Sequence, residues 1–135
     1  LSRIVWSTNT ILYLSAKSKS DGVANMEKAK QQSGWRAEYP AFRWCDDLGE
    51  GWYLPAINEM NAIIKQSEVL NRGLIDKLDG IYLSSTESKK RPEDCKASNV
   101  TSAIATTTGE GKGFVTYKDH CRYLGGYKVR AVAKF

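Results

Sequence analysis

The stretch of sequence that decides the fold is Gly51-Trp52-Tyr53-Leu54-Pro55-Ala56-Ile57-Asn58-Glu59-Met60. Its first part predicts a short apolar strand that stops at Pro55, and a proline suits the first turn of a helix because its missing N–H is not needed there. A second stretch, Tyr82-Leu83-Ser84-Ser85-Thr86-Glu87, predicts a strand whose polar residues gather at its end. Neither stretch carries a pattern of catalytic residues.

The length and composition are those of one globular domain. A chain of 135 residues, 41% apolar and 26% charged, predicts a single domain over residues 1–135. No apolar run approaches the roughly 20 residues of a membrane span. Because the chain lacks an initiator methionine and begins at Leu1 inside an apolar segment, we expect a mature or excised fragment of a larger protein.

The positive charge is unevenly distributed. Residues 1–85 contain ten Lys/Arg and ten Asp/Glu, whereas residues 86–135 contain ten Lys/Arg and five Asp/Glu, so the whole net charge of +5 lies in the last part. Such asymmetry is typical of proteins with an acidic partner, although a basic solvated surface has the same composition. The lack of a long basic run and of an aromatic RNP-type motif argues against nucleic acid as that partner.

The first half of the chain predicts helices. One helix, over residues 22–33, begins after the N-cap Asp21 and ends at Gly34. A second begins at Pro40 and ends at Gly49. Its apolar stripe, at helical spacing, consists of Ala41, Trp44, Cys45 and Leu48.

A third helix is expected to begin near Pro55, with a short further helix from Ser67 to about Leu78. The core stripe of the third helix consists of Ile57, Met60, Ile63 and Ile64.

The second half predicts β-strands. The sequence indicates strands over residues 81–86, 100–108, 114–117 and 127–135, with one more over Leu1–Trp6. The order of a strand, then helices, then an antiparallel run of strands predicts the α+β class.

Three cysteines, Cys45, Cys95 and Cys121, form no Cys-x-x-Cys pair, which argues against a zinc site. The residues leave two alternatives open: one disulfide with one free thiol, or three free thiols. The helical stripe places Cys45 on a buried face, where a thiol acts as a small hydrophobe.

Three motifs in this order resemble those of a known family. They are Trp44-Cys45 with Gly51-Trp52-Tyr53-Leu54-Pro55 and Asn58-Glu59-Met60, then Tyr82-Leu83-Ser84-Ser85-Thr86-Glu87, then Lys128-Val129-Arg130-Ala131-Val132. On these motifs, residues 35–135 resemble the Lcl C-terminal domain-like family of bacterial secreted and surface proteins.

The resemblance implies a C-type-lectin-like fold, in which two or three helices pack on a twisted antiparallel sheet and the N- and C-terminal strands pair. Here Leu1–Trp6 would pair with Tyr127–Phe135. The resemblance further implies no catalytic residues, no cofactor, and a role in adhesion outside the cell or at the bacterial surface. Some relatives link the helix cysteine to one in the last strand; Ala131 stands near that place, which would leave Cys45 unpaired.

The segments Arg91–Cys95 and Tyr117–Cys121 also resemble the ligand loop of animal-type C-type lectins. That resemblance implies a disulfide between Cys95 and Cys121 at the base of the loop. Arg91 and Lys118, however, stand where those lectins carry calcium ligands, and cations oppose a divalent ion. We therefore expect no metal site.

Loops 88–98 and 117–126 interleave aromatic and basic residues and are the predicted ligand site. Aromatic faces stack on sugar rings, and cations pair with sulfate or carboxylate groups. The expected ligand is an acidic polysaccharide, with a host or cell-surface protein as the alternative partner; the oligomeric state is left open. The predicted site residues are Lys89, Arg91, Glu93, Asp94, Tyr117, Lys118, Asp119, Arg122 and Tyr123.

We expect no enzyme activity. His120 and Cys121 are adjacent, and neighbours in an extended segment point to opposite faces, so they do not make a nucleophile pair. Glu87, Glu93 and Asp94 are expected to be solvated loop acids. Two functions remain: a non-catalytic extracellular binding or adhesion module, and a structural or assembly domain of a larger surface protein.

Overall fold

The computed structural model describes residues 4–8, 12–66, 78–90, 101–108, 112–118 and 127–133. Within these ranges the protein is α+β, as predicted, with four helices and two antiparallel sheets. The helices are α1 (Gly22–Lys30), α2 (Trp35–Glu38), α3 (Pro40–Asp46) and α4 (Ile57–Lys65). The strands are β1 (Trp52–Tyr53), β2 (Ile81–Ser88), β3 (Ser102–Thr107), β4 (Phe114–Tyr117) and β5 (Val132–Ala133).

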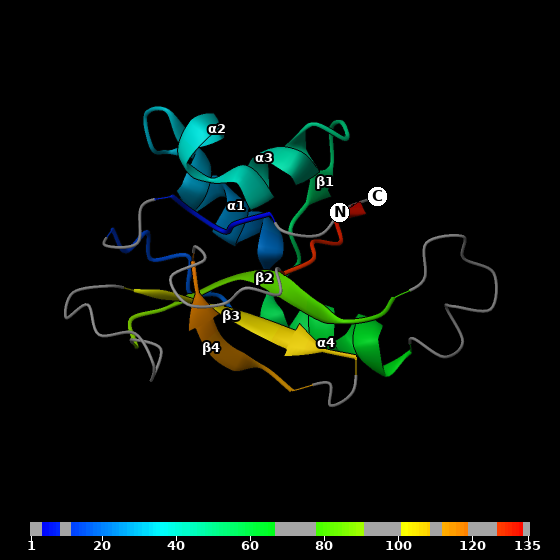
Figure 1. Ribbon diagram of the computed structural model, residues 1–135. Coiled ribbons are helices and arrows are strands. Elements are labelled where there is room, and N and C mark those ends of the chain that lie inside the picture. The colour runs from blue at the N-terminus through cyan, green and yellow to red at the C-terminus, as the bar shows by residue number, and fades with distance from the viewer. Residues whose placement is uncertain are drawn as a thin grey trace.

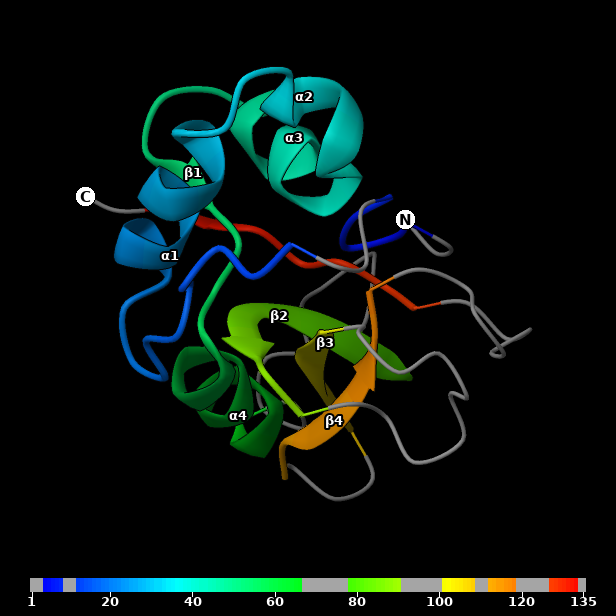
Figure 2. The ribbon, with the colours of Figure 1, turned by 90° about the vertical axis from the view of Figure 1, so that its left-hand side faces the viewer.

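The larger sheet has the strand order β2-β3-β4, and the helices lie on two sides of it. In Figure 1, α1, α2 and α3 gather above this sheet, and β2 is the strand nearest to them. Figure 2 shows α4 beside the sheet, apart from the other three helices. The smaller sheet, β1 with β5, lies with the upper group of helices.

The outer edge of β2 is covered by three segments that are far apart in sequence. Each of them accepts a hydrogen bond from an N–H of β2, so this edge is closed although no regular strand runs along it. The bonds are Leu83 N to Lys128 O at 3.0 Å, Ser85 N to Pro55 O at 2.8 Å, and Glu87 N to Ala16 O at 2.7 Å.

The start of α1 packs unusually close to the chain after β1. The side chain of Asp21 caps the helix by accepting from Ala24 N at 3.0 Å, as predicted. A Cβ atom on Gly22 would lie 2.5 Å from Leu54 O and 2.8 Å from the ring of Tyr53. Only glycine therefore fits where α1 meets this segment.

The buried face of α3 differs from the predicted stripe. Ala41 and Cys45 are buried as expected, but Leu48 is 47% exposed and Trp44 is only partly buried. The helix ends at Asp46, so Leu48 lies beyond the regular spacing on which the prediction rested. Phe42 takes the inward position, and its ring packs edge-on against Trp6 at 5.0 Å.

The stripe predicted for α4 is confirmed. Ile57, Met60 and Ile64 are buried, and Ile63 is partly buried against the same cluster. The strand predicted over residues 114–117 is confirmed, and those predicted over 81–86 and 100–108 appear as β2 and β3. The helix predicted from Ser67 lies outside the described residues apart from Leu78.

The predicted pairing of the terminal strands is wrong for the residues that the structure describes. Residues 4–6 form no strand, and β5 pairs with β1, with Trp52 opposite Ala133 and Tyr53 opposite Val132. The N-terminal segment is held by other contacts, because Val5 O accepts from Ala41 N and the indole of Trp6 donates to Ser84 O at 2.8 Å.

The close approach of α1 gives a stability prediction. We expect Gly22→Ala to lower the free energy of unfolding by about 3 kcal/mol, because the added methyl group meets backbone that must move. Chemical denaturation monitored by circular dichroism measures this loss. Gly34→Ala is the control: Gly34 has φ +72° but no atom within 4 Å of an added Cβ. It should cost only about 1 kcal/mol for the left-handed backbone, and equal losses in the two variants would contradict the steric account.

Candidate functional site

Glu87 is the last residue of the second motif. We expected it to be solvated, but the structure shows that it is buried. Its carboxylate accepts hydrogen bonds from the backbone N–H of Leu14 at 2.9 Å and of Ala16 at 3.1 Å. It also forms an ion pair with the ammonium of Lys118 at 2.5 Å, and both side chains are 0% exposed. Glu87 thus ties the N-terminal segment and the end of β4 to β2.

Lys118 is likewise an interior residue, so it is not the exposed ligand contact that the sequence predicted. Its ammonium donates to Leu12 O at 3.0 Å and to Thr101 Oγ1 at 2.6 Å, in addition to Glu87. It lies 4.7 Å from the centre of the Trp6 ring. Burial lowers the pKa of Lys118, and the Glu87 carboxylate opposes that shift.

Glu59, in the first motif, holds a second junction. One carboxylate oxygen accepts from Gly22 N at 2.8 Å and from Ala56 N at 3.0 Å, and the other accepts from the hydroxyl of Tyr53 at 2.7 Å. Burial, together with this carboxylate, raises the pKa of Tyr53 to about 12. Glu59 therefore joins the starts of α1 and α4 to β1.

The hydroxyl groups of the second motif are also used inside the protein. Thr86 Oγ1 donates to Ser18 O at 2.8 Å and accepts from Ile57 N at 3.0 Å. Ser84 Oγ donates to Ile104 O at 2.6 Å, and Ser85 Oγ accepts from the amide of Asn25 at 3.0 Å. These three hydroxyl groups are structural, because neighbouring backbone and side-chain groups are their hydrogen-bond partners.

The strand register brings the two predicted ligand loops to one end of the sheet. Ser88 of β2 is paired with Ser102 of β3, and Ser102 is paired with Tyr117 of β4. Loop 88–98 follows Ser88 and loop 117–126 begins at Tyr117, so both leave the same end of the sheet, from the strands on either side of β3. Lys89 is exposed there, with its ammonium 5.1 Å from the centre of the Tyr13 ring.

The other predicted site residues lie outside the described part of the chain. The structure describes the backbone of Tyr117, and the remaining members are Arg91, Glu93, Asp94, Cys95, Asp119, Cys121, Arg122 and Tyr123. The disulfide predicted between Cys95 and Cys121 therefore stays a prediction. Among the described residues, no cluster of three or more His, Cys, Asp or Glu side chains is placed to hold a metal ion. None of the described helices has the length and apolar character needed to cross a membrane.

Cys45 is a free, buried thiol, as its place on the helix predicted. Burial, helped by the Asp46 carboxylate, raises its pKa to about 12. A thiol of this kind is inert at neutral pH.

Trp52, which the sequence places in the short apolar strand before Pro55, is a surface residue. It is 38% exposed and lines a pocket of about 260 Å³ between α1 and β1. Side chains alternate between two faces along a strand, so of Trp52 and Tyr53 only one can face inward. That alternation is the one signal in the sequence that could have identified Trp52 as exposed.

No protein-family model matches the chain, and neither a curated protein nor a solved structure was found to match it. The functional argument therefore depends on the geometry of this chain alone.

The buried ion pair gives a second stability prediction. We expect Lys118→Met to lower the free energy of unfolding by about 3 kcal/mol, because it leaves the Glu87 carboxylate buried without its counter-charge. Denaturant titration measures the loss. Lys89→Met removes the same charge from an exposed position and should change stability by less than about 0.5 kcal/mol. Similar stabilities for wild type and Lys118→Met would contradict the interior position of this lysine.

The raised pKa of the Cys45 thiol predicts that it reacts slowly in the folded protein. A variant carrying Cys95→Ser and Cys121→Ser leaves Cys45 as the single thiol. Because its pKa is about 12 against an ordinary 9.0, its thiolate population at pH 8 should be on the order of a thousandfold smaller than that of a free thiol. We expect a chromogenic disulfide reagent to label it only when denaturant is added. Rapid labelling of the folded variant would show that Cys45 is accessible.

Proposed function

We propose that this domain is a non-catalytic binding module of C-type-lectin-like fold that recognises acidic glycans outside the cell or at its surface. The observation that carries the proposal is the register of the sheet, in which loops 88–98 and 117–126 start at the same end, from the two strands that flank β3. Loops that start at one end of a sheet are the usual position of a binding site on a rigid scaffold.

The charge of these loops favours an anionic ligand. Lys89 and Lys90 are exposed where β2 ends, and the sequence continues with Arg91. Lys118 is buried and paired with Glu87, so it is not among the proposed ligand contacts. The cations proposed to contact the ligand are Lys89, Lys90, Arg91 and Arg122. Tyr117 and Tyr123 would supply the aromatic faces against which sugar rings stack.

The use of the motif residues supports binding rather than catalysis. Glu59 and Glu87 would be the natural acids and bases of an active site, but both carboxylates are fully engaged with backbone N–H groups and with Tyr53 or Lys118. A general acid or base must be able to reach a substrate proton. The same motifs, here forming the internal junctions, support the proposed fold.

The second candidate is a structural or assembly domain of a larger surface protein. Large apolar side chains that remain exposed, Leu48 at 47% and Phe114 at 37%, favour a protein partner for this alternative. Binding measurements with glycans separate the two functions.

The test is binding to immobilised sulfated and uronic-acid polysaccharides, at two salt concentrations and with or without EDTA. We expect binding that weakens with salt and is unaffected by EDTA, because ion pairs are screened whereas no calcium is involved. The triple variant Lys89→Gln, Arg91→Gln, Arg122→Gln should bind about tenfold more weakly.

A matched control separates a local site from general attraction. Lys19→Gln, Lys28→Gln and Lys65→Gln remove three exposed lysines elsewhere and lower the net charge by the same amount. This control should bind nearly as well as the wild type. Equal losses in both triple variants would overturn the loop site, loss of binding in EDTA would assign the loops to calcium, and no binding at all would favour the assembly domain.

A further inference from the structure

A pocket between α1 and β1 is separate from the proposed glycan loops. Its volume is about 260 Å³, and its walls come from α1 on one side and from the segment Glu50–Tyr53 on the other. Drug-sized ligands occupy roughly 300–1,000 Å³, so this pocket has room for a small group rather than for an oligosaccharide.

The walls of the pocket combine apolar and aromatic groups. Val23 and Met26 contribute apolar side chains from α1, and Met26 is almost completely buried beneath the surface. Trp52 lines the opposite side with its indole partly exposed to solvent. Such a lining would hold an alkyl group, and the face of an indole attracts a cation more strongly than any other side-chain ring.

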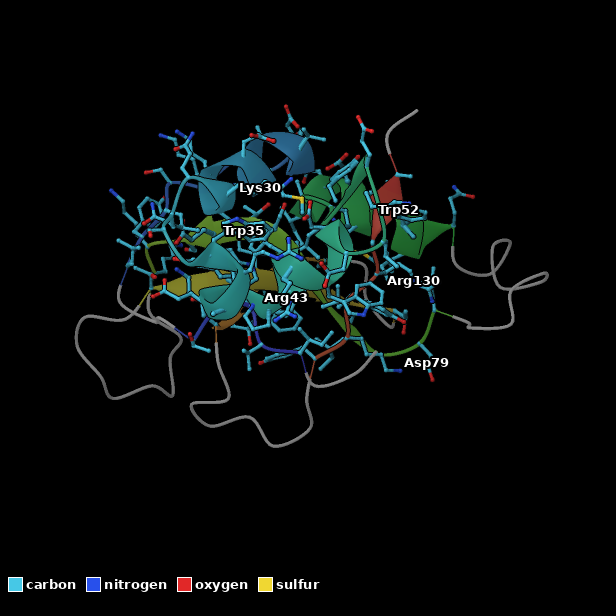
Figure 3. All side chains as sticks on the ribbon, turned by 90° about the horizontal axis from the view of Figure 1, so that it is seen from above. Lys30, Trp35, Arg43, Trp52, Asp79 and Arg130 are labelled. Carbon is cyan, nitrogen blue, oxygen red and sulfur yellow. The ribbon has the colours of Figure 1, made fainter. Side chains whose placement is uncertain are left out.

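The charged groups at the pocket are predominantly acidic. Glu27 and Glu50 line it from opposite sides, and neither forms an ion pair within the described ranges. Lys30 also lines the pocket, and its ammonium is paired with Asp46 on α3 at 2.9 Å and lies 5.9 Å from the centre of the Trp35 ring. Figure 3 shows Lys30 and Trp52 on the same upper face of the molecule.

We propose that this pocket binds a small organic cation, an ammonium group carrying short alkyl substituents. Trp52 would contact the cation through its ring face, Glu27 and Glu50 would neutralise its charge, and Val23 and Met26 would cover its methyl or methylene groups. A metal ion is a poorer fit, because a hard cation takes six or more oxygen ligands and the indole and aliphatic side chains offer none. An anion would meet the carboxylates of Glu27 and Glu50.

The probe is choline, compared with 3,3-dimethylbutan-1-ol, which has the same shape without the charge. We expect choline to bind with a dissociation constant on the order of a millimolar, as measured by the shift of the Trp52 indole N–H signal in ¹⁵N NMR. Trp52→Phe assigns that signal among the four tryptophans. The neutral analogue should bind at least about fivefold more weakly, since it lacks the cation–π and charge interactions.

Variants of the carboxylates localise the site. Glu27→Gln and Glu50→Gln should each weaken choline binding about threefold. Both residues are exposed, so the fold should be retained. Asp79→Asn removes an equal charge from an exposed residue outside the pocket lining (Figure 3) and should have no effect.

Three results would overturn the proposal: equal binding of choline and its neutral analogue, an unchanged Trp52 signal at saturating choline, or equal effects of Asp79→Asn and the two pocket variants. Acidic-glycan binding by the loops is measured separately and can fail or succeed without affecting this outcome.

Discussion

The structure depends on one buried charge pair, Glu87 with Lys118. Two charges without solvent exposure are expensive to desolvate, and such a pair is stable only when further hydrogen bonds satisfy the remaining lone pairs and protons. Here they do: the carboxylate also accepts from the N–H of Leu14 and Ala16, and the ammonium also donates to Leu12 O and Thr101 Oγ1. The pair therefore fixes, at one point, the N-terminal segment, the end of β2, the start of β3 and the end of β4.

This arrangement explains how a chain with long irregular segments forms a defined interior. Residues 12–20 and 54–56 contain no regular helix or strand, so their backbone groups lack the partners that secondary structure provides. The polar side chains of the two motifs supply these partners: Glu87 and Thr86 bind residues 14–18, and Glu59 binds the backbone of Ala56. These irregular segments are thereby held against β2.

Residue spacing and capping patterns predicted the helices and strands that are determined by residues close together in the sequence. The stripe of α4, the N-cap Asp21 and strand β4 follow from spacing and capping chemistry, and all three were predicted. The burial of Lys118 could not be predicted in the same way, because its partner Glu87 lies 31 residues away. A lysine in a polar segment of the sequence is expected to be exposed to solvent. The pairing of β5 with β1 is likewise a contact between segments far apart in sequence, which local spacing does not specify.

Each of the two proposed binding surfaces lies next to one of two carboxylates, Glu87 or Glu59. The Glu87–Lys118 pair lies where the basic loops leave the sheet, and Glu59 joins Gly22 of α1 to Tyr53 of β1, the two elements that enclose the acidic pocket. Each proposed surface thus adjoins one of these junctions, and the described charged residues Lys89, Glu27 and Glu50 are exposed. Since the interior uses the polar side chains of the motifs, the proposed ligand contacts come from neighbouring side chains, with Trp52 as the exception. Tyr53 beside it donates to Glu59, and the alternation of the strand turns the indole outward. A motif that is required for the fold can in this way also present a ligand contact.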